Sequence, residues 1–297
     1  MDPVPFQFCD SVTSLLSNLT QGPKDYCNYQ TSNDCFWKQA FQEHLLNRKE
    51  IQINLSHENG QWFASAQTVR PIDFAVVDKI PLKYLRLHTF LVTTNDKNSL
   101  KKPVNCAQVI PFIRSISCTQ SKLTLESVPP SSEPDLCSLL QPFFDVLFFY
   151  VSIAAYCSAY EHFLAYKLSK KGFKKLSLMG ENWPNHVKEQ ISNAVLKNEI
   201  KHCNVGFTNF KFDFAFFEQL FAVMDAKKRT SFVGKFDFSW SLIESWKLEN
   251  AFEIEEDDEW GWKRDDGSFF VLSCCNDLFI THGYIHIMIE VMEEYAY

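Results

Sequence analysis

The chain has 297 residues, of which 46% are hydrophobic and 22% are charged, and its formal net charge is −7. This composition excludes a disordered chain and a fibrous repeat, and the acidic balance argues against a dedicated nucleic-acid binder, which usually carries a basic excess. Only 9 residues are glycine. Neither G-x-G-x-x-G nor G-x-x-x-x-G-K-[ST] occurs, so the sequence offers no phosphate loop of the kind that nucleotide enzymes use.

The N-terminus and the cysteines indicate an intracellular protein. Residues 1–5 contain neither a basic region nor an apolar stretch, so they do not resemble a secretory signal. The 10 cysteines form no C-x-x-C motif and several lie among apolar neighbours, as free thiols do in a reducing compartment. We therefore expect a cytoplasmic or nuclear location, or both.

One apolar run could be mistaken for a membrane span. Residues 146–160 are 15 residues without a charge, whereas a membrane-spanning helix needs roughly 20. Asp145 precedes the run and Glu161 follows it. We expect a buried strand followed by a buried helix, and no membrane association.

Residues 1–48 are predicted to form a small helical module. Asp10 or Ser11 can cap a helix whose single apolar stripe is formed by Val12, Leu15, Leu16 and Leu19. A second helix is expected after Asn33-Asp34, with one face formed by Phe36, Trp37, Ala40, Phe41 and Leu45. A module this short can hardly bury all of these side chains, so we expect a partner to cover some of them.

Residues 49–105 are predicted to be rich in strands. Residues 51–55 alternate apolar and polar side chains, and residues 61–64 form a second such run. Asn59-Gly60 between them is a strong signal for a β-hairpin. Residues 84–87 and 91–92 continue in strand-like fashion, and residues 97–103 are expected to form a polar loop.

From residue 106 to residue 297 the sequence repeats, with a strand pair and a helix stripe in each unit. In the reference unit the strand pair is Leu176 and Leu178, and the helix stripe is Val187, Ile191, Ala194 and Val195. The strand pair recurs 29 residues later and 27 residues earlier, at Val205 and Phe207 and at Phe149 and Val151. An earlier pair is Leu123 and Leu125, and a later strand is expected over residues 232–238.

Repeating β–α units of this length favour a leucine-rich-repeat-like solenoid, in which strands line one face and helices line the other. The alternative is a doubly wound sheet, since any α/β protein has strands about thirty residues apart. We favour the solenoid because strand pairs and helix stripes stay in register, although the usual asparagine ladder is missing. The predicted fold class is therefore α/β: a helical module at residues 1–48, a β-rich connection at residues 49–105, and a β–α repeat region at residues 106–297 with a C-terminal cap.

No catalytic or metal-binding motif stands out. The sequence has no G-x-S-x-G, no H-E-x-x-H and no kinase signature. His282 and His286 follow Cys274-Cys275, but adjacent cysteines do not fit the ligand spacing of a structural zinc site. We predict no enzymatic activity, no metal and no cofactor, and keep an enzyme of unrecognised type as a third hypothesis.

Three segments resemble the nematode family of F-box-like proteins. The chain begins Val4-Pro5-Phe6-Gln7-Phe8-Cys9-Asp10-Ser11-Val12, which is similar to the family's V-P-x-x-F-C-[DE]-S/D-V start. Residues 37–48 (WKQAFQEHLLNR) resemble W-x-x-A-F-x-x-H-x-x-N-R, and residues 180–184 (GENWP) resemble G-x-W-P with one extra residue. Residues 24–33 depart from the family pattern, because they lack a leucine-rich second helix.

The resemblance implies a non-catalytic substrate-recognition subunit of a Skp–cullin–F-box type ubiquitin ligase. The N-terminus would bind a Skp-type adaptor, and through it a cullin scaffold, with contacts from Val4, Pro5, Phe8, Leu15, Leu16 and Trp37. Trp37 fits a core position equally well. The repeat region would bind a target protein. The alternative hypothesis is a stand-alone protein-binding solenoid with no ligase role.

In a β–α solenoid, the side chains between the buried strand pairs lie on the exposed face. With Leu176/Leu178 and Val205/Phe207 buried, the predicted substrate-binding residues are Lys175, Ser177, Asn204 and Thr208, continued by Lys235 and Asp237. Outward polar residues are equally expected of any half-exposed strand. Helices on both sides of the sheet would refute the solenoid and the site together.

Overall fold

The chain folds into two compact units of mixed α/β structure in the computed structural model. Unit 1 comprises residues 1–124 and 146–148, and unit 2 comprises residues 125–145 and 149–297. The structure describes residues 7, 9–10, 35–68, 70–77, 79–94, 96, 100–118, 120–127, 133–225, 231–238, 242, 252–254, 259–263, 269–274 and 285–292. The boundaries predicted after residues 48 and 105 both fall within unit 1.

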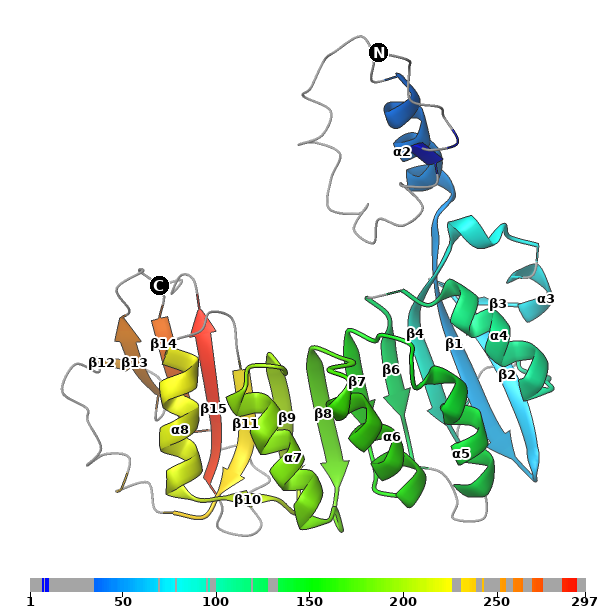
Figure 1. Ribbon diagram of the computed structural model, residues 1–297. Helices are drawn as coiled ribbons and strands as arrows, with labels where there is room; N and C mark the ends of the chain where they lie inside the picture. The colour runs from blue at the N-terminus through cyan, green and yellow to red at the C-terminus, as the bar shows by residue number, and fades with distance from the viewer. Residues whose placement is uncertain are drawn as a thin grey trace. The chain divides into compact units, whose positions relative to one another are not determined.

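Unit 1 is built around a small mixed sheet (Figure 1). Its helical elements are α2 (Cys35–Asn47), α3 (Phe74–Val77), η1 (Leu82–Tyr84) and α4 (Cys106–Ile116). Its strands are β1 (Lys49–Glu58), β2 (Gln61–Gln67), β3 (Pro71–Ile72), β4 (Leu85–Thr93) and β5 (Lys102–Pro103), with most of β6 (Lys122–Leu125). β1 pairs in parallel with β4 and in antiparallel fashion with β2, which also pairs with β3 and β5.

The hairpin predicted around Asn59-Gly60 is confirmed. Both residues have positive φ, 51° and 79°, which is the backbone of the two-residue turn that suits the twist of paired strands. Glu58 pairs directly with Gln61 across the turn. Ile51, Ile53 and Leu55 on one side of β1 are fully buried, and Asn54 and Ser56 on the other side are buried too, as in a strand covered on both sides over this stretch.

The predicted second helix, α2, is confirmed, and a polar network holds it against the end of η1. The buried His44 ring lies 3.0 Å from an Asp10 carboxylate oxygen through Nε2. The Lys83 ammonium reaches the carboxylates of both Asp10 and Glu43, at 3.2 and 3.3 Å. Tyr84 donates its hydroxyl to Glu43 as well. The first predicted helix lies outside the described residues.

Unit 2 alternates strands and helices along the chain and ends in antiparallel strands. Its helical elements are α5 (Glu133–Leu140), η3 (Gln141–Phe143), α6 (Ser158–Ser169), α7 (Asn185–Leu196) and α8 (Phe214–Asp225). Its strands are β7 (Tyr150–Ile153), β8 (Lys175–Gly180), β9 (His202–Thr208), β10 (Lys211–Phe212), β11 (Ser231–Phe236), β12 (Phe252–Ile254), β13 (Glu259–Lys263), β14 (Phe269–Cys274) and β15 (Ile285–Met292).

The strands of unit 2 stand in the order β7-β8-β9-β11-β15-β14-β13-β12. β7, β8, β9 and β11 are parallel to one another, whereas β15, β14, β13 and β12 add on in antiparallel fashion. Figure 1 shows α6, α7 and α8 on the same side of the strands. Right-handed crossovers that always add the next strand at the same edge of the sheet keep the parallel strands in chain order. They also place all the helices on one side of the sheet.

The core of unit 2 lies between these strands and helices. The predicted α7 stripe is confirmed, with Val187 and Ile191 fully buried and Ala194 and Val195 nearly so. The helix-facing strand residues are equally buried: Val151, Ile153, Leu176, Leu178, Cys203, Val205, Phe232 and Phe236. Figure 1 and this burial together define a covered side of the strands and an opposite side that we call the open face.

The register of the repeats differs from the predicted one. Leu176 pairs with Cys203 in β9, an offset of 27 residues rather than the predicted 29. On the other side Leu176 pairs with Val151, an offset of 25 rather than 27. The buried partners of Leu176 and Leu178 are therefore Cys203 with Val205 and Val151 with Ile153. The prediction that Phe149 and Phe207 are buried is wrong.

Consecutive β–α units are joined in the same way at each junction. The backbone N–H groups at the start of one strand donate to a carbonyl just before the preceding strand: Lys174 and Lys175 to Phe149, Lys201 and His202 to Lys174, and Ser231 to Lys201. Lys171 and Asn198, each two residues beyond the end of α6 or α7, both have a left-handed backbone, with φ of 54° and 56°. These two positions are 27 residues apart, so the loops repeat as well as the strands.

Candidate functional site

The residues predicted to bind an adaptor lie almost entirely outside the described part of the chain. Val4, Pro5, Phe8, Leu15 and Leu16 are not among the described residues. Trp37 lies on α2, but its side chain is outside the described structure. The candidate site is therefore built from the second predicted set, which lies on unit 2.

Three rows of side chains cross the open face, because parallel strands bring residues at matching positions together. The first row is Tyr150, Lys175, His202 and Ser231, and the second is Ser152, Ser177, Asn204 and Val233. In the third row Met179 pairs with Phe207, and Lys235 lies two residues beyond Val233 on β11. The described helices of unit 2 pack on the covered side, so none of them lies over these rows.

The first row forms a basic end of the open face. The Lys175 ammonium lies 5.4 Å from the centre of the Phe149 ring, within cation–π distance. Burial lowers the pKa of His202, and the neighbouring ammonium groups of Lys175 and Lys201 lower it further. His202 is therefore a neutral imidazole at pH 7, and its Nδ1 lies 2.9 Å from the Ser231 hydroxyl.

The second row is a floor of short polar side chains. Ser152 and Asn204 are half-buried, and the Asn204 side chain accepts a hydrogen bond from the backbone N–H of Gly206. Ser177, predicted to be exposed, is only 4% exposed. Its short side chain sits in a central strand between Ser152 and Asn204, its cross-strand partners. The prediction of an exposed Ser177 is therefore wrong, although the residue lies in the predicted row.

A β-bulge in β9 determines which side chain of this strand lies in the third row. Ser177 pairs with Asn204, but Met179 pairs with Phe207, so β9 has two residues where β8 has one. One extra residue reverses the side to which all later side chains of the strand point. Phe207 consequently lies on the open face and is 54% exposed, whereas Thr208 turns inward and is fully buried. The predicted exposure of Thr208 is wrong for this reason.

Thr208 has a structural role in its buried position. Its hydroxyl donates to the Val205 carbonyl at 2.7 Å and accepts from the Phe210 N–H at 3.1 Å, which fixes the turn after β9. The predicted site residue Lys235 is half-buried and donates its ammonium to the Thr208 carbonyl at 2.8 Å. Asp237 is exposed, as predicted, and its backbone N–H donates to Phe212.

The structure thus brings Lys175, Ser177 and Asn204 together in adjacent rows, and adds residues that sequence reasoning missed. Phe149, Met179, Phe207 and His202 belong to the open face, and Lys201 stands directly before His202 at the start of β9. The pair Lys174-Lys175 and the pair Lys201-His202, spaced 27 residues apart, could have indicated a basic end had the correct offset been used. No local signal in the sequence marks the bulge that exposes Phe207.

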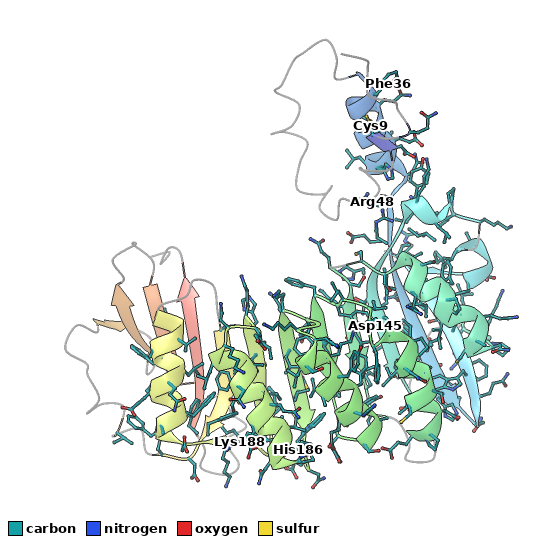
Figure 2. All side chains as sticks on the ribbon, in the orientation of Figure 1. Cys9, Phe36, Arg48, Asp145, His186 and Lys188 are labelled. Carbon is teal, nitrogen blue, oxygen red and sulfur yellow. The ribbon has the colours of Figure 1, made fainter. Side chains whose placement is uncertain are left out.

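A second polar cluster lies at the opposite ends of the strands, where α6 and α7 begin. Tyr156 donates its hydroxyl to Glu161 at 2.8 Å, and the other Glu161 oxygen lies 2.9 Å from His186 Nε2. Figure 2 shows His186 at the start of α7. The carboxylate of Glu161 raises the pKa of Tyr156 to about 12, so the phenol stays protonated at pH 7. The cluster ties two successive helices together.

The described residues contain no group of three or more His, Cys, Asp or Glu side chains placed to hold a metal ion. Within the same residues, no helix is long and apolar enough to cross a membrane. Comparison with models of protein families, with curated proteins and with solved structures finds no match to this chain.

Proposed function

We propose that this chain is a non-catalytic protein-recognition subunit that binds a target protein on the open face of unit 2. The observation that carries the proposal is the asymmetry of the sheet. One side is covered by α6, α7 and α8, while the other presents half-buried polar side chains and the exposed apolar side chains of Phe149, Met179 and Phe207. A sheet side that no helix of the described residues covers, and that is neither fully polar nor fully apolar, resembles a protein-binding surface in composition.

The proposal includes the finer fold assignment, a short leucine-rich-repeat-like solenoid. It is supported by the junction bonds and left-handed positions that recur from one β–α unit to the next. Asn209 adds a further bond between units, because its side chain accepts from the backbone N–H of Trp183 and donates to the Trp183 carbonyl, both at 2.9 Å. This is one side-chain bridge between neighbouring units, of the kind whose repetition makes an asparagine ladder. Stacked units of this type give extended binding faces.

We further propose that the N-terminal region docks the chain on a Skp-type adaptor of a cullin-based ubiquitin ligase. The resemblance of residues 4–12 and 37–48 to F-box-like proteins supports this. So does the exposed apolar surface of α2, where Leu45 and Leu46 are 46% and 77% exposed. Phe36, at the start of the same helix (Figure 2), is exposed too. The network around Asp10 and Lys83 would hold α2 in place for docking.

The test of target binding places a photoreactive benzoylphenylalanine at position 204 in place of Asn204, in the full-length chain. The control places it at position 190 in place of Gln190, which is exposed on α7 on the covered side. We expect a protein to crosslink from position 204 but not from position 190, and the same protein, once purified, to bind the unmodified chain in solution. Equal crosslinking from both positions, or from neither, would contradict binding on the open face.

The test of adaptor docking co-expresses the full-length chain with a Skp-type adaptor. We expect co-purification, and its loss in Leu45→Ser/Leu46→Ser with an unchanged melting temperature, because both side chains are exposed. Gln39→Ser, also exposed on α2, is the matched control and should keep the adaptor. If the folded chain binds no adaptor while crosslinking persists at position 204, the stand-alone binder replaces the ligase subunit. The compactness of unit 2 on its own favours that second candidate.

A further inference from the structure

The basic end of the open face stands out in a chain of net charge −7. The two loops that lead into β8 and β9, residues 170–175 and 197–202, contain six lysines, one histidine and one carboxylate. That carboxylate, Glu199, is 2.9 Å from Lys171 and so belongs to an ion pair already. None of the described carboxylates forms an ion pair with Lys174, Lys175 or Lys201.

Helix dipoles explain only part of this charge. Lys170, Lys171 and Lys197 follow the last residues of α6 and α7 directly, where positive charge is favourable. Lys175 is the first residue of β8, and Lys201 stands immediately before β9. The dipole effect falls off within the last turn of a helix, so it does not account for these two lysines. The two lysines belong to neighbouring strand starts, because the backbone N–H of Lys201 donates to the Lys174 carbonyl at 2.9 Å and Lys175 pairs with His202.

The other end of the open face is apolar. Met179 and Phe207 are register partners and are 38% and 54% exposed. Met179 is four residues beyond Lys175 on β8, about 13 Å at roughly 3.3 Å per residue. The floor between the two ends consists of the short side chains of Ser152 and Ser177 with Asn204. An extended segment lying along the strands would therefore meet positive charge first and an apolar pair about four residues later.

We propose that the open face binds an extended segment of the target protein that carries acidic residues about four positions from a large apolar residue. The carboxylates of the bound segment lie at Lys175 and Lys201, and its apolar side chain lies between Met179 and Phe207. This inference rests on the proposed function, and specifies the chemistry of its target. Charge complementarity argues for an acidic occupant, and the exposed Phe207 argues for an apolar residue within it.

The test measures binding of short fluorescent peptides to the full-length chain by fluorescence anisotropy. The probe peptides have a neutral Gly/Ser/Thr background with two adjacent Glu and one Leu four residues away, in both chain directions. We expect one direction to bind saturably, and more weakly as salt is raised. Replacing both Glu by Gln, or Leu by Ser, should weaken that binding. Phosphoserine in place of Glu distinguishes a phosphorylated from a carboxylate source of the negative charge.

Variants of the protein test whether the peptide binds on the open face. Lys175→Glu and Lys201→Glu should each weaken binding roughly fivefold, since reversal removes an attraction and adds a repulsion of exposed-pair strength. Lys197→Glu is the matched control, with the same change of charge at the end of α7, and should leave binding within about twofold. Phe207→Ser should weaken binding of the Leu peptide but have little effect on the Ser peptide.

Three results would overturn the inference: no binding of either probe by the folded chain, equal binding of the Gln peptide, or equal weakening by Lys197→Glu. Its failure is distinguishable from failure of the proposed function. If a target crosslinks at position 204 and its binding is unchanged in Lys175→Glu and Lys201→Glu, the ligand chemistry is wrong and the open face remains a binding surface. If no target crosslinks there, the proposed function itself fails.

Discussion

Replacing Lys167 with methionine should remove a pH-dependent part of the folding free energy of this protein. Lys167 lies on α6 and is fully buried. Its ammonium donates to the carbonyls of Phe143 and Phe144, both at 2.8 Å, and lies 5.3 Å from the centre of the Phe163 ring. These contacts compensate only part of the cost of removing a charge from water.

The magnitude follows from the pKa of this group. Burial lowers the pKa of Lys167 from 10.5 to about 8, against an opposing effect of the Asp145 carboxylate. Below pH 8 the amine is protonated in both the folded and the unfolded chain. Between about pH 8 and pH 10.5 the unfolded chain holds a proton that the folded chain has released, so the free energy of unfolding rises with pH. At about 1.4 kcal/mol per pKa unit, the increase from pH 7 to pH 10 is about 2.5 kcal/mol.

Urea unfolding of the wild-type chain and of Lys167→Met, at pH 7 and at pH 10, measures this increase as a double difference. Cysteines and tyrosines that titrate in the same range are common to both proteins and cancel. Methionine is unbranched and fills a similar volume, so the variant should fold. Lys170→Met, which changes an exposed lysine next to α6, should retain the wild-type pH dependence. An identical pH dependence in wild type and Lys167→Met would refute the reasoning.

Three further substitutions test the packing of unit 2 through urea or thermal unfolding. Gly234→Ala should destabilise by about 1–3 kcal/mol, because a Cβ at this position would lie 2.5 Å from the Phe232 ring; a loss below about 0.5 kcal/mol would show that the ring moves freely. Gly180→Ala should cost about 1–2 kcal/mol, since its φ of 88° is left-handed, and an unchanged stability would contradict that backbone. Asn209→Ala should cost about 1–2 kcal/mol through its two bonds to Trp183, with Asn209→Asp, which keeps only the acceptor, intermediate between the two.

Much of the fold could be predicted because local chemistry determines it. Asn59-Gly60 specifies a turn that few other residue pairs adopt, so the hairpin was predictable from the pair alone. The α7 helix was predictable because its apolar stripe has helical spacing and Pro184 stands just before its first residue. Both features depend on residues that are close in sequence.

Pairing between strands could not be predicted in the same way. The offset between β8 and β9 is decided by the length of the loop after α7, where Asn198 adopts a left-handed backbone. Counting apolar residues gave an offset of 29, because Val205 and Phe207 imitate the spacing of Leu176 and Leu178. The partner of Leu176 is Cys203, a small residue that does not stand out in an apolar pattern. The basic end of the site was missed for the same reason, since Lys175 and His202 become neighbours only at an offset of 27.

The bulge in β9 has consequences beyond the exposure of one side chain. Without the extra residue, Phe207 would continue the buried alternation after Val205, and Thr208 would take its place on the open face beside Met179. With the extra residue present, the buried Thr208 hydroxyl holds the turn that follows β9. The backbone carbonyl of Thr208 accepts a hydrogen bond from the Lys235 ammonium. The bulge therefore both turns Phe207 outward beside Met179 and places Thr208 where it fixes the turn after β9. A β-bulge can re-aim a side chain, and here the bulge places Phe207 beside Met179 at the apolar end of the open face.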